Sequence, residues 1–272
     1  MIVQHNLTAM NSNRMLGITT DSQAKSTEKL SSGYKINRAA DDAAGLAISE
    51  KMRRQMRGLT QASANAQDGI SCVQTAEGAL AEVHDMLQRM NELAIKASND
   101  TMTSIDRGYI DAEVQQLKTE INRVRSTTTF NEMNLLTGEF TGKNLQVGAE
   151  AGQFIMISIG NMDCTTLKIN ETSVSGADNS EAQKAIDAIK LALKEVSTQR
   201  SDLGAVQNRL EHTIKNLDNV VENTTSAESA IRDTDMATEM VRYSNNNILA
   251  QAGTSMLAQA NQANQNVLSL LG

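Results

Sequence analysis

Residues that could perform chemistry occur in a few places, and none has the spacing of a catalytic centre. The adjacent carboxylates Asp41 and Asp42 come closest to an acid–base or metal-binding pair. They precede helix-forming residues, so we expect them to cap and charge the start of a helix that begins within residues 43–49. Residues 138–143 resemble a phosphate-binding loop, but the spacing is one residue short and no Ser or Thr follows the lysine. We therefore predict no nucleotide site.

The histidines and cysteines are equally scattered. His5, His84 and His212 lack ligand spacing, and His212 lies outside the apolar pattern of its segment, so we expect it to be exposed. We interpret Cys72 and Cys164 as free thiols that pack like small hydrophobic side chains; a disulfide or a redox site is the alternative. The sequence thus predicts no cofactor, no metal and no enzymatic activity.

Composition indicates a helical molecule. The 272 residues include no Pro and no Trp, and only 2% are aromatic. The absence of Pro permits very long helices, and the scarcity of aromatic residues argues against a compact core. We therefore predict a mainly α fold: an elongated antiparallel helical bundle or coiled coil, with a small β-hairpin region at its outer end. The net charge of −7 argues against nucleic acid as a partner.

No sequence stretch approaches roughly 18 continuous apolar residues, so no membrane span is expected. The first residues lack the charged start and apolar run of a secretory signal. The chain is therefore expected either to stay in the cytoplasm or to leave without a cleaved signal.

Three segments carry apolar residues at alternating steps of three and four, which places these residues on one face of a helix. The segments are 59–97, 110–124 and 186–221. In the last one, Arg200 and Gln207 interrupt the series and are expected to set register. Because the first and last segments come from opposite halves of the chain, the simplest packing is antiparallel. The first series is Leu59, Ala62, Ala66, Gly69, Val73, Ala76, Leu80, Val83, Leu87, Met90, Ala94 and Ala97.

Between these helices the period changes to that of strands. Leu145 and Val147 precede a glycine-containing turn at 148–152, and β-branched residues follow over 154–159. This pattern predicts a hairpin. Residues 173–180 are rich in Ser, Gly, Asp and Asn, and are expected to form a loop.

The two ends of the chain are predicted to be unable to fold alone. From Tyr243 to Gly272 there is no charged side chain. Each end carries only a thin apolar stripe, too little to offset roughly 1–2 kcal/mol of backbone entropy per residue. Such ends become ordered only when other copies or partners supply the missing surface, which is the behaviour of a subunit that polymerises. The predicted polymerisation residues are Val3, Leu7, Met10, Leu249, Met256, Val267 and Leu270, with Ala252, Ala260 and Ala263 between them.

Several long motifs, in order, resemble the terminal signatures of bacterial flagellin. Near the start they are Leu30-Ser-Ser-Gly-Tyr-Lys-Ile-Asn37, Asp41-Asp-Ala-Ala-Gly45 and Gly58-Leu-Thr-Gln-Ala-Ser63. Near the end they are Gln251-Ala-Gly-Thr-Ser255, Leu257-Ala-Gln-Ala-Asn-Gln262 and Asn266-Val-Leu-Ser-Leu-Leu271. Two positions depart from the pattern: Ala263 stands where many relatives have Pro, and Gly272 where they have a basic residue.

The resemblance implies an inner coiled-coil domain formed by residues 1–42 and 235–272. It implies a helical bundle domain over 43–234, with the hairpin region at about 138–175. Larger flagellins insert outer domains where this chain has only the 173–180 loop, so outer domains are expected to be absent.

The resemblance also implies a function. The chain would be a structural subunit that polymerises into the bacterial flagellar filament for motility. Its partners would be other copies of itself, a flagellar export chaperone, the type III export apparatus, and the filament cap and junction proteins. Its location would be secreted, in the extracellular flagellum.

A further partner is implied by residues 88–94, which resemble the flagellin segment recognised by the vertebrate Toll-like receptor for flagellin. The matching receptor-binding positions are Arg89, Leu93 and Glu113, while Asn91 stands where better-known ligands carry Arg. We expect the Leu93 side chain to point beside the apolar series of residues 59–97 and to form an exposed apolar anchor. The alternative is that these residues chiefly make lateral contacts in the filament.

Other interpretations remain at this point. The basic residues Lys51, Arg53, Arg54 and Arg57 are expected to form subunit–subunit ion pairs or a solvated face rather than a nucleic-acid patch. A filament-junction protein has a similar architecture. A soluble signalling coiled coil would explain the heptads but not the uncharged ends, and an enzyme is a poor third alternative.

Overall fold

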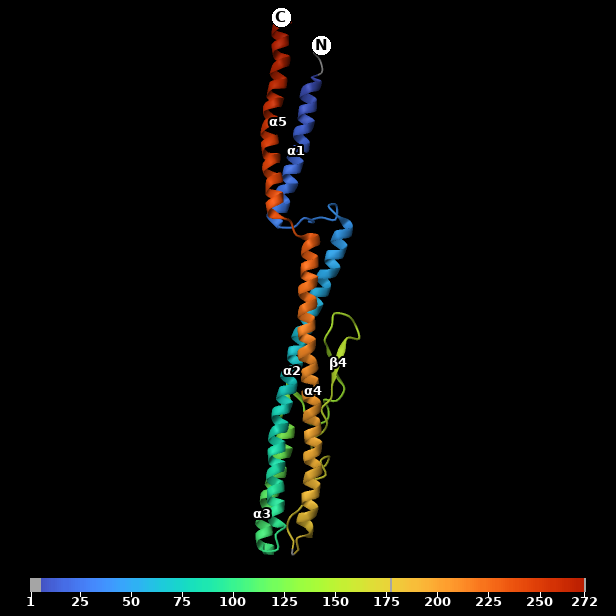
Figure 1. The fold of residues 1–272 in the computed structure, drawn as a ribbon, viewed down its shortest axis with the longest axis vertical. Helices are drawn as coiled ribbons and strands as arrows, with labels where there is room; N and C mark the ends of the chain where they lie inside the picture. The colour runs from blue at the N-terminus through green and yellow to red at the C-terminus, as the bar shows by residue number, and fades with distance from the viewer. Residues whose placement is uncertain (1–5, 177, 272) are drawn as a thin grey trace. The chain divides into compact units, whose positions relative to one another are not determined.

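The fold is mainly α-helical, as predicted. The computed structural model describes residues 6–176 and 178–271, with the side chains described as far as Gln262. Within these residues there are five helices and two small β-hairpins (Figure 1). The helices are α1 (Leu7–Ser32), α2 (Ala43–Ala97), α3 (Ser104–Thr127), α4 (Ser180–Arg232) and α5 (Met236–Leu271).

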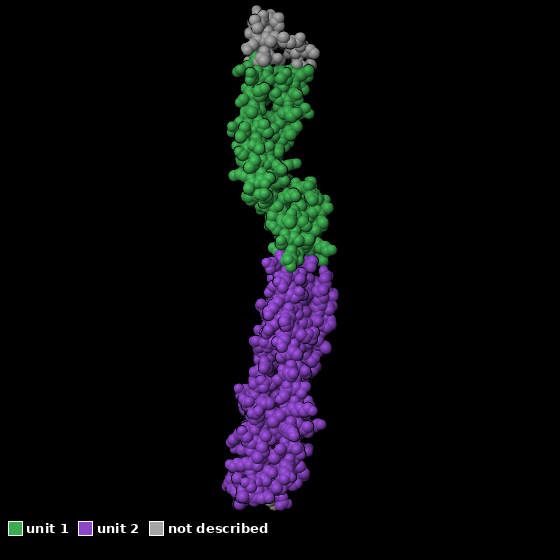
Figure 2. Space-filling view, in the orientation of Figure 1, with its two compact units in different colours: residues 1–54, 223–272 green, residues 55–222 purple. Residues whose placement is uncertain are grey.

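The chain divides into two compact units (Figure 2). Unit 1 comprises residues 1–54 and 223–272, and unit 2 comprises residues 55–222. These boundaries fall inside α2 and α4, so each of these helices contributes to both units. The domain boundaries expected from the sequence lie between residues 42 and 43 and between residues 234 and 235. They fall where α2 begins and in the linker between α4 and α5, and they stay a prediction.

Unit 2 is held together by the predicted seams. Every position of the series from Leu59 to Ala97 is buried. Because α4 runs antiparallel to α2, Leu217 shares a small core with Leu59, and further along Arg200 forms an ion pair with Glu77 at 3.5 Å. Arg200 therefore replaces an apolar seam contact with a charged one between two helices, which is consistent with a role in register.

The predicted hairpin packs on the helices. Strand β3 (Lys143–Gln146) pairs antiparallel with β4 (Phe154–Ile157). It approaches α2 at two glycines: a Cβ built at Gly58 would lie 2.9 Å from the Cβ of Ala149, and one built at Gly69 would overlap the Leu145 side chain. These glycines let the hairpin lie close to α2.

A second hairpin was not predicted. Strand β1 (Thr129–Phe130) pairs with β2 (Met133–Asn134). Its two turn residues, Asn131 and Glu132, have φ of 48° and 64°, the left-handed combination found in tight hairpin turns.

Polar side chains of α3 fasten the loop that follows β4. The Oδ1 of Asp111 accepts hydrogen bonds from the Ser173 hydroxyl and the Val174 amide, both at 2.8 Å. The buried Lys118 ammonium donates to the carbonyl of Asn170 at 3.1 Å, and burial lowers the pKa of Lys118. The helix thus supplies hydrogen bonds to loop backbone that has no strand partner.

In unit 1 the two linkers that precede α2 and follow α4 pair with each other. The Lys35 amide donates to the carbonyl of Arg232 at 2.7 Å, and the Thr234 amide donates to the carbonyl of Gly33 at 2.9 Å. The Arg232 guanidinium lies 4.9 Å from the Tyr34 ring centroid and forms a 2.7 Å ion pair with Glu50. These contacts tie the two chain segments together within unit 1.

The two adjacent carboxylates have different roles. Asp42 caps α2, as expected, because its Oδ1 accepts a hydrogen bond from the Gly45 amide at 2.9 Å. Asp41 instead closes the preceding turn: its Oδ2 accepts from the amides of Arg38 and Asn37, and these bonds lower the pKa of Asp41.

Candidate functional site: the exposed face of the terminal helices

Helices α1 and α5 lie side by side and antiparallel in unit 1 (Figure 1). The Asn6 side chain donates to the carbonyl of Ala260 at 3.1 Å, and the Asn246 side chain donates to the Ser22 hydroxyl at 3.0 Å. Between these points, Gly253 faces Leu16: a Cβ at Gly253 would lie 3.3 Å from Leu16 Cδ1. Small and polar residues therefore make most of this contact.

The pair buries no apolar side chain among the described residues. The only buried residues are Ser26 in α1 and Glu239 in α5. Large apolar side chains remain half or more exposed along both helices, a pattern that marks a surface meant to be covered. They are Leu7, Met10, Met15, Ile18, Met236, Met240, Val241, Ile248, Leu249 and Met256.

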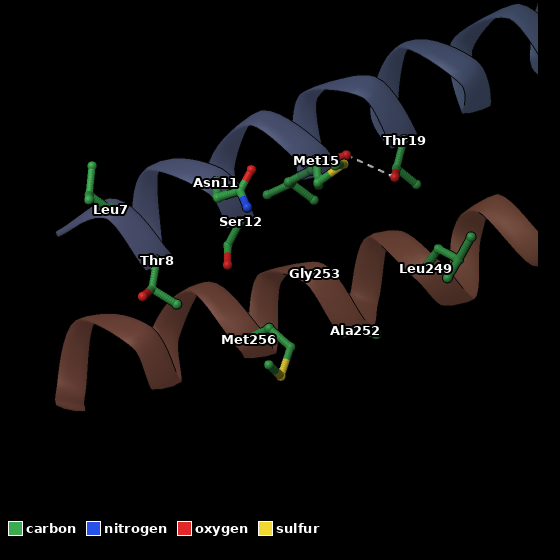
Figure 3. Close-up of a pocket in the computed structure, with 11 residues that line it drawn as sticks. Leu7, Thr8, Asn11, Ser12, Met15, Thr19, Leu249, Ala252, Gly253 and Met256 are labelled. Atoms are coloured by element: carbon green, nitrogen blue, oxygen red, sulfur yellow. Dashed lines mark hydrogen bonds between the residues drawn. The ribbon is translucent and has the colours of Figure 1, made fainter.

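Part of this exposed surface forms a groove of about 610 Å³ between the two helices (Figure 3). Leu7 and Met15 line it from α1, and Leu249 and Met256 line it from α5. Leu249 and Met256 are each 58% exposed. Leu249, Ala252 and Met256 of the predicted stripe therefore line a groove open to solvent, whereas Ala260, further along the same stripe, contacts α1 through its backbone carbonyl.

The structure can be compared with each predicted polymerisation residue. Leu7, Leu249 and Met256 all line the groove, while Met10 is 63% exposed and does not line it. Val3 lies outside the described residues, and so do the side chains of Val267 and Leu270. The role of all seven in polymerisation stays a prediction.

Sequence reasoning missed several exposed apolar residues, including Met15, Ile18, Val241 and Ile248. The sequence did contain a signal for them, because these residues fall on more than one face of each helix. A helix that carries apolar residues on several faces needs more than one neighbour.

Charge is confined to the start of α5. Asp235 caps this helix by accepting from the Ala237 and Thr238 amides and from the Thr238 hydroxyl, and these bonds, led by that of the hydroxyl, lower the pKa of Asp235. Glu239 and Arg242 form an ion pair at 3.3 Å. From Tyr243 onward no charged side chain follows. Covering this part of α5 therefore desolvates no charge of its own, which removes a large cost of burial.

The second predicted surface lies in unit 2, and one of its residues needs correction. The Arg89 guanidinium pairs with Glu113 at 2.9 Å and with Glu92 at 3.2 Å, and the hydrogen bonds to Glu113 are the main cause of a raised Arg89 pKa. Leu93 is only 3% exposed and belongs to the main core, so the prediction of an exposed Leu93 anchor was wrong. The face of α2 beside the seam is covered by α3. The exposed ring next to this charged cluster is Tyr109.

The other candidate chemical groups have structural surroundings. Cys72 and Cys164 are free, buried thiols, as predicted, and burial raises the pKa of both. His212 is exposed, as expected, and His84 shares a 2.9 Å hydrogen bond with Gln88. His5 lies outside the described residues. Within the described chain, no group of three or more His, Cys, Asp or Glu side chains could hold a metal ion.

Two further expectations concern surfaces. Of the basic residues at 51–57, Arg53 forms an ion pair with Glu50 at 3.3 Å, while Lys51 and Arg57 are exposed. Their pairing between subunits stays a prediction.

Among the helices that the structure describes, none is long and apolar enough to cross a membrane.

Antiparallel helical seams and an exposed pair of terminal helices define a mainly α-helical protein. Two family models match the chain: the bacterial flagellin N-terminal helical region over residues 3–141 and the bacterial flagellin C-terminal helical region over residues 186–271. The chain belongs to the bacterial flagellin family, whose members are structural proteins and not enzymes.

Full-length relatives agree with this assignment. The chain is 55% identical over 271 residues to the flagellin of Halalkalibacterium halodurans, covering 100% of both chains. It is 52% identical over 285 residues to the flagellar filament 31.3 kDa core protein of Treponema maltophilum, again covering 100% of both. The crystal structure of Bacillus cereus flagellin matches with a TM-score of 0.51 at 26% identity, covering 57% of this chain and 88% of that one.

A structure of a putative flagellar hook-associated protein from Vibrio parahaemolyticus matches with a TM-score of 0.60 at 12% identity, covering 71% of this chain and 100% of that one. At that identity the match shows a shared fold alone. The high sequence identity between this chain and full-length flagellins favours a flagellin over the alternative of a filament-junction protein.

Proposed function

We propose that this chain is a structural subunit that polymerises into the bacterial flagellar filament and so serves motility. The observation that carries the proposal is the α1–α5 pair, which buries no apolar side chain among its described residues. Copies of the same chain can supply the missing cover, because each brings an equally exposed pair. Membership of the flagellin family and the name of the Treponema maltophilum relative, a filament core protein, support this assignment.

The mechanism is assembly driven by burial. Unit 2 has a closed core and needs no partner to fold, whereas the exposed side chains of unit 1 gain stability only when neighbours cover them. Addition of a subunit therefore couples the stability of the terminal helices to the polymer. This coupling lets a subunit stay soluble before addition and become fixed afterwards.

The same family assignment supports a proposal for how the chain is delivered to the growing filament. We include in the proposal export through the flagellar type III apparatus with an export chaperone, and contacts with the filament cap and junction proteins. The site of action is then the extracellular flagellum, reached by secretion. Terminal helices that bury no apolar side chain between them favour such a route, because they are expected to unfold more readily than unit 2.

The test is to assemble the purified chain and examine it by electron microscopy and sedimentation, beside a variant that lacks residues 243–272. The full chain should form filaments, while the truncated chain should stay unassembled yet show a cooperative helical melt from unit 2. Filaments of normal yield from the truncated chain would overturn the proposal.

A second role, as a ligand of the flagellin-sensing Toll-like receptor, is favoured by the exposed Arg89–Glu113 pair beside Tyr109. Arg89 and Glu113 have side-chain exposures of 53% and 46%, so both are accessible in the single chain. Leu93 supports this surface from below and does not contact a partner directly. Arg89→Asp should weaken receptor binding by more than about tenfold. The matched control is Arg123→Asp, which removes another exposed ion pair on α3; equal binding by the parent and Arg89→Asp would refute this role.

A further inference from the structure

Unit 1 contains a lysine-rich pocket that the α1–α5 groove does not include. Lys25 and Lys29 from α1 and Lys35 from the following linker line a hollow of about 420 Å³, together with Asp41 and Asp42. We call this hollow the lysine pocket. None of the three lysine side chains has an ion pair among the described residues.

The two aspartates at the pocket offset the charge of the three lysines only in part: besides its backbone hydrogen bonds, the Asp41 carboxylate is attracted to Lys29 and Lys25, and one lysine charge remains in excess. The Asp41 carboxylate accepts the backbone amides of Arg38 and Asn37, at 2.9 and 3.1 Å. Asp42 caps α2 through the Gly45 amide. Both carboxylates are thus held by backbone groups, and the pocket keeps an excess of positive charge in a chain whose net charge is −7.

Polymerisation makes this excess charge a constraint, so the inference rests on the proposed function. When neighbours cover α1, an ammonium group that loses water without gaining a carboxylate is strongly unfavourable. Whatever covers the pocket must therefore bring negative charge. We propose that the lysine pocket receives the carboxylates of Glu82 and Asp85 from a second copy of this chain.

These two carboxylates fit for three reasons. Both are exposed, and neither has an ion pair among the described residues. Residues 58–88 contain no Lys or Arg, and the next basic residue on α2, Arg89, lies four positions after Asp85 but is paired with Glu113 and Glu92. The i, i+3 spacing of the two carboxylates places them roughly 5–6 Å apart, which matches the i, i+4 spacing of Lys25 and Lys29.

Three other carboxylates near charged groups are already paired. Glu28 is paired with Arg38 at 2.9 Å, Glu50 with Arg232 at 2.7 Å, and Glu113 with Arg89 at 2.9 Å. Recruiting any of these would break an existing ion pair, whereas Glu82 and Asp85 break none.

The contact joins two different surfaces, one in unit 1 and the other in unit 2. Such a contact is heterologous: each copy donates one surface and accepts the other, so the association continues from copy to copy. Contacts of this kind produce open helical polymers when the rotation does not close a ring. The pairing of lysine pocket and Glu82–Asp85 would therefore set which way a subunit adds.

Charge exchange tests the proposal. Lys25→Glu/Lys29→Glu and Glu82→Lys/Asp85→Lys should each raise the critical concentration for assembly by more than about tenfold, about 1.4 kcal/mol. The chain that combines all four changes should recover to within about threefold of the parent, because the charges are complementary again. The control Lys190→Glu/Lys194→Glu has the same spacing and the same change of net charge on exposed lysines of α4, and it should assemble like the parent. Circular dichroism melts establish that each variant is folded.

The outcomes separate this contact from polymerisation itself. Normal assembly of the first two variants, no recovery in the combined chain, or an equal defect in the control would overturn the lysine-pocket contact and leave the proposed function intact. Failure of the parent chain to assemble would overturn both.

Discussion

Replacing Leu249 and Met256 by Gln should weaken assembly without weakening the subunit. Both side chains are 58% exposed in the groove, so little of their surface is buried in the single chain. Fully burying a side chain of this size contributes about 1.5–3 kcal/mol, so covering the exposed fraction contributes about 1–2 kcal/mol for each residue. The pair together therefore contributes about 2–4 kcal/mol on polymerisation.

Loss of this free energy corresponds to an increase of roughly 30- to 700-fold in the critical concentration for assembly. Sedimentation of the variant over a concentration series measures it. The thermal melt of the unassembled chain should change little, because Gln is a good helix former and neither side chain is buried there.

The matched control is Leu191→Gln on α4, where the leucine is 57% exposed but belongs to unit 2. It should shift the critical concentration by less than about threefold. An equal shift in the control, or assembly of the double variant at the parent concentration, would refute the reasoning that the terminal groove is the surface buried on assembly.

Three further predictions concern the subunit itself. Gly78→Ala should raise the free energy of unfolding by about 0.5–1 kcal/mol, because α2 has open space at this position. Gly69→Ala should lower the free energy of unfolding, because the new Cβ would overlap the Leu145 side chain. Urea unfolding of both variants tests this contrast, and equal effects would contradict it. Asp235 has a lowered pKa in the folded chain, so its cap stabilises α5 fully at pH values above the ordinary Asp pKa of about 3.9, and this stabilisation is lost as the pH falls through the lowered pKa. Asp235→Asn should remove this acid-dependent loss of helicity, which circular dichroism measures. A pH profile unchanged by the substitution would count against the cap. Leu93→Ala should cost about 2–5 kcal/mol of unfolding free energy, because Leu93 is buried, and a change below about 0.5 kcal/mol would place it on the surface after all.

The helical seams could be predicted from sequence because their periodicity is local. Leu59, Leu80 and Ala94 occupy equivalent positions of one heptad repeat, and all are buried. The position of Leu93 could not be predicted in the same way. It follows a seam residue by three positions, and its burial depends on α3 packing over that side of α2, which is a tertiary contact with no signal in the α2 sequence.

The candidate site was predictable in kind but not in orientation. The lack of charge after Tyr243 and the spacing of Leu249 and Met256 were sufficient to predict a face that needs cover. Which side of α5 would contact α1 depended on the close approach at Gly253, which periodicity does not encode. The short β1–β2 hairpin was missed because two-residue strands are too short to show alternation.

Amide hydrogen exchange, compared between unassembled subunits and the assembled polymer, tests the central claim most directly. If α1 and α5 are completed only by neighbouring copies, their amides should exchange rapidly in the subunit while the α2 seam of unit 2 is protected. Their exchange should slow by at least about tenfold on assembly. Protection of α1 and α5 in the single subunit equal to that of the α2 seam, with no increase on assembly, would contradict the account.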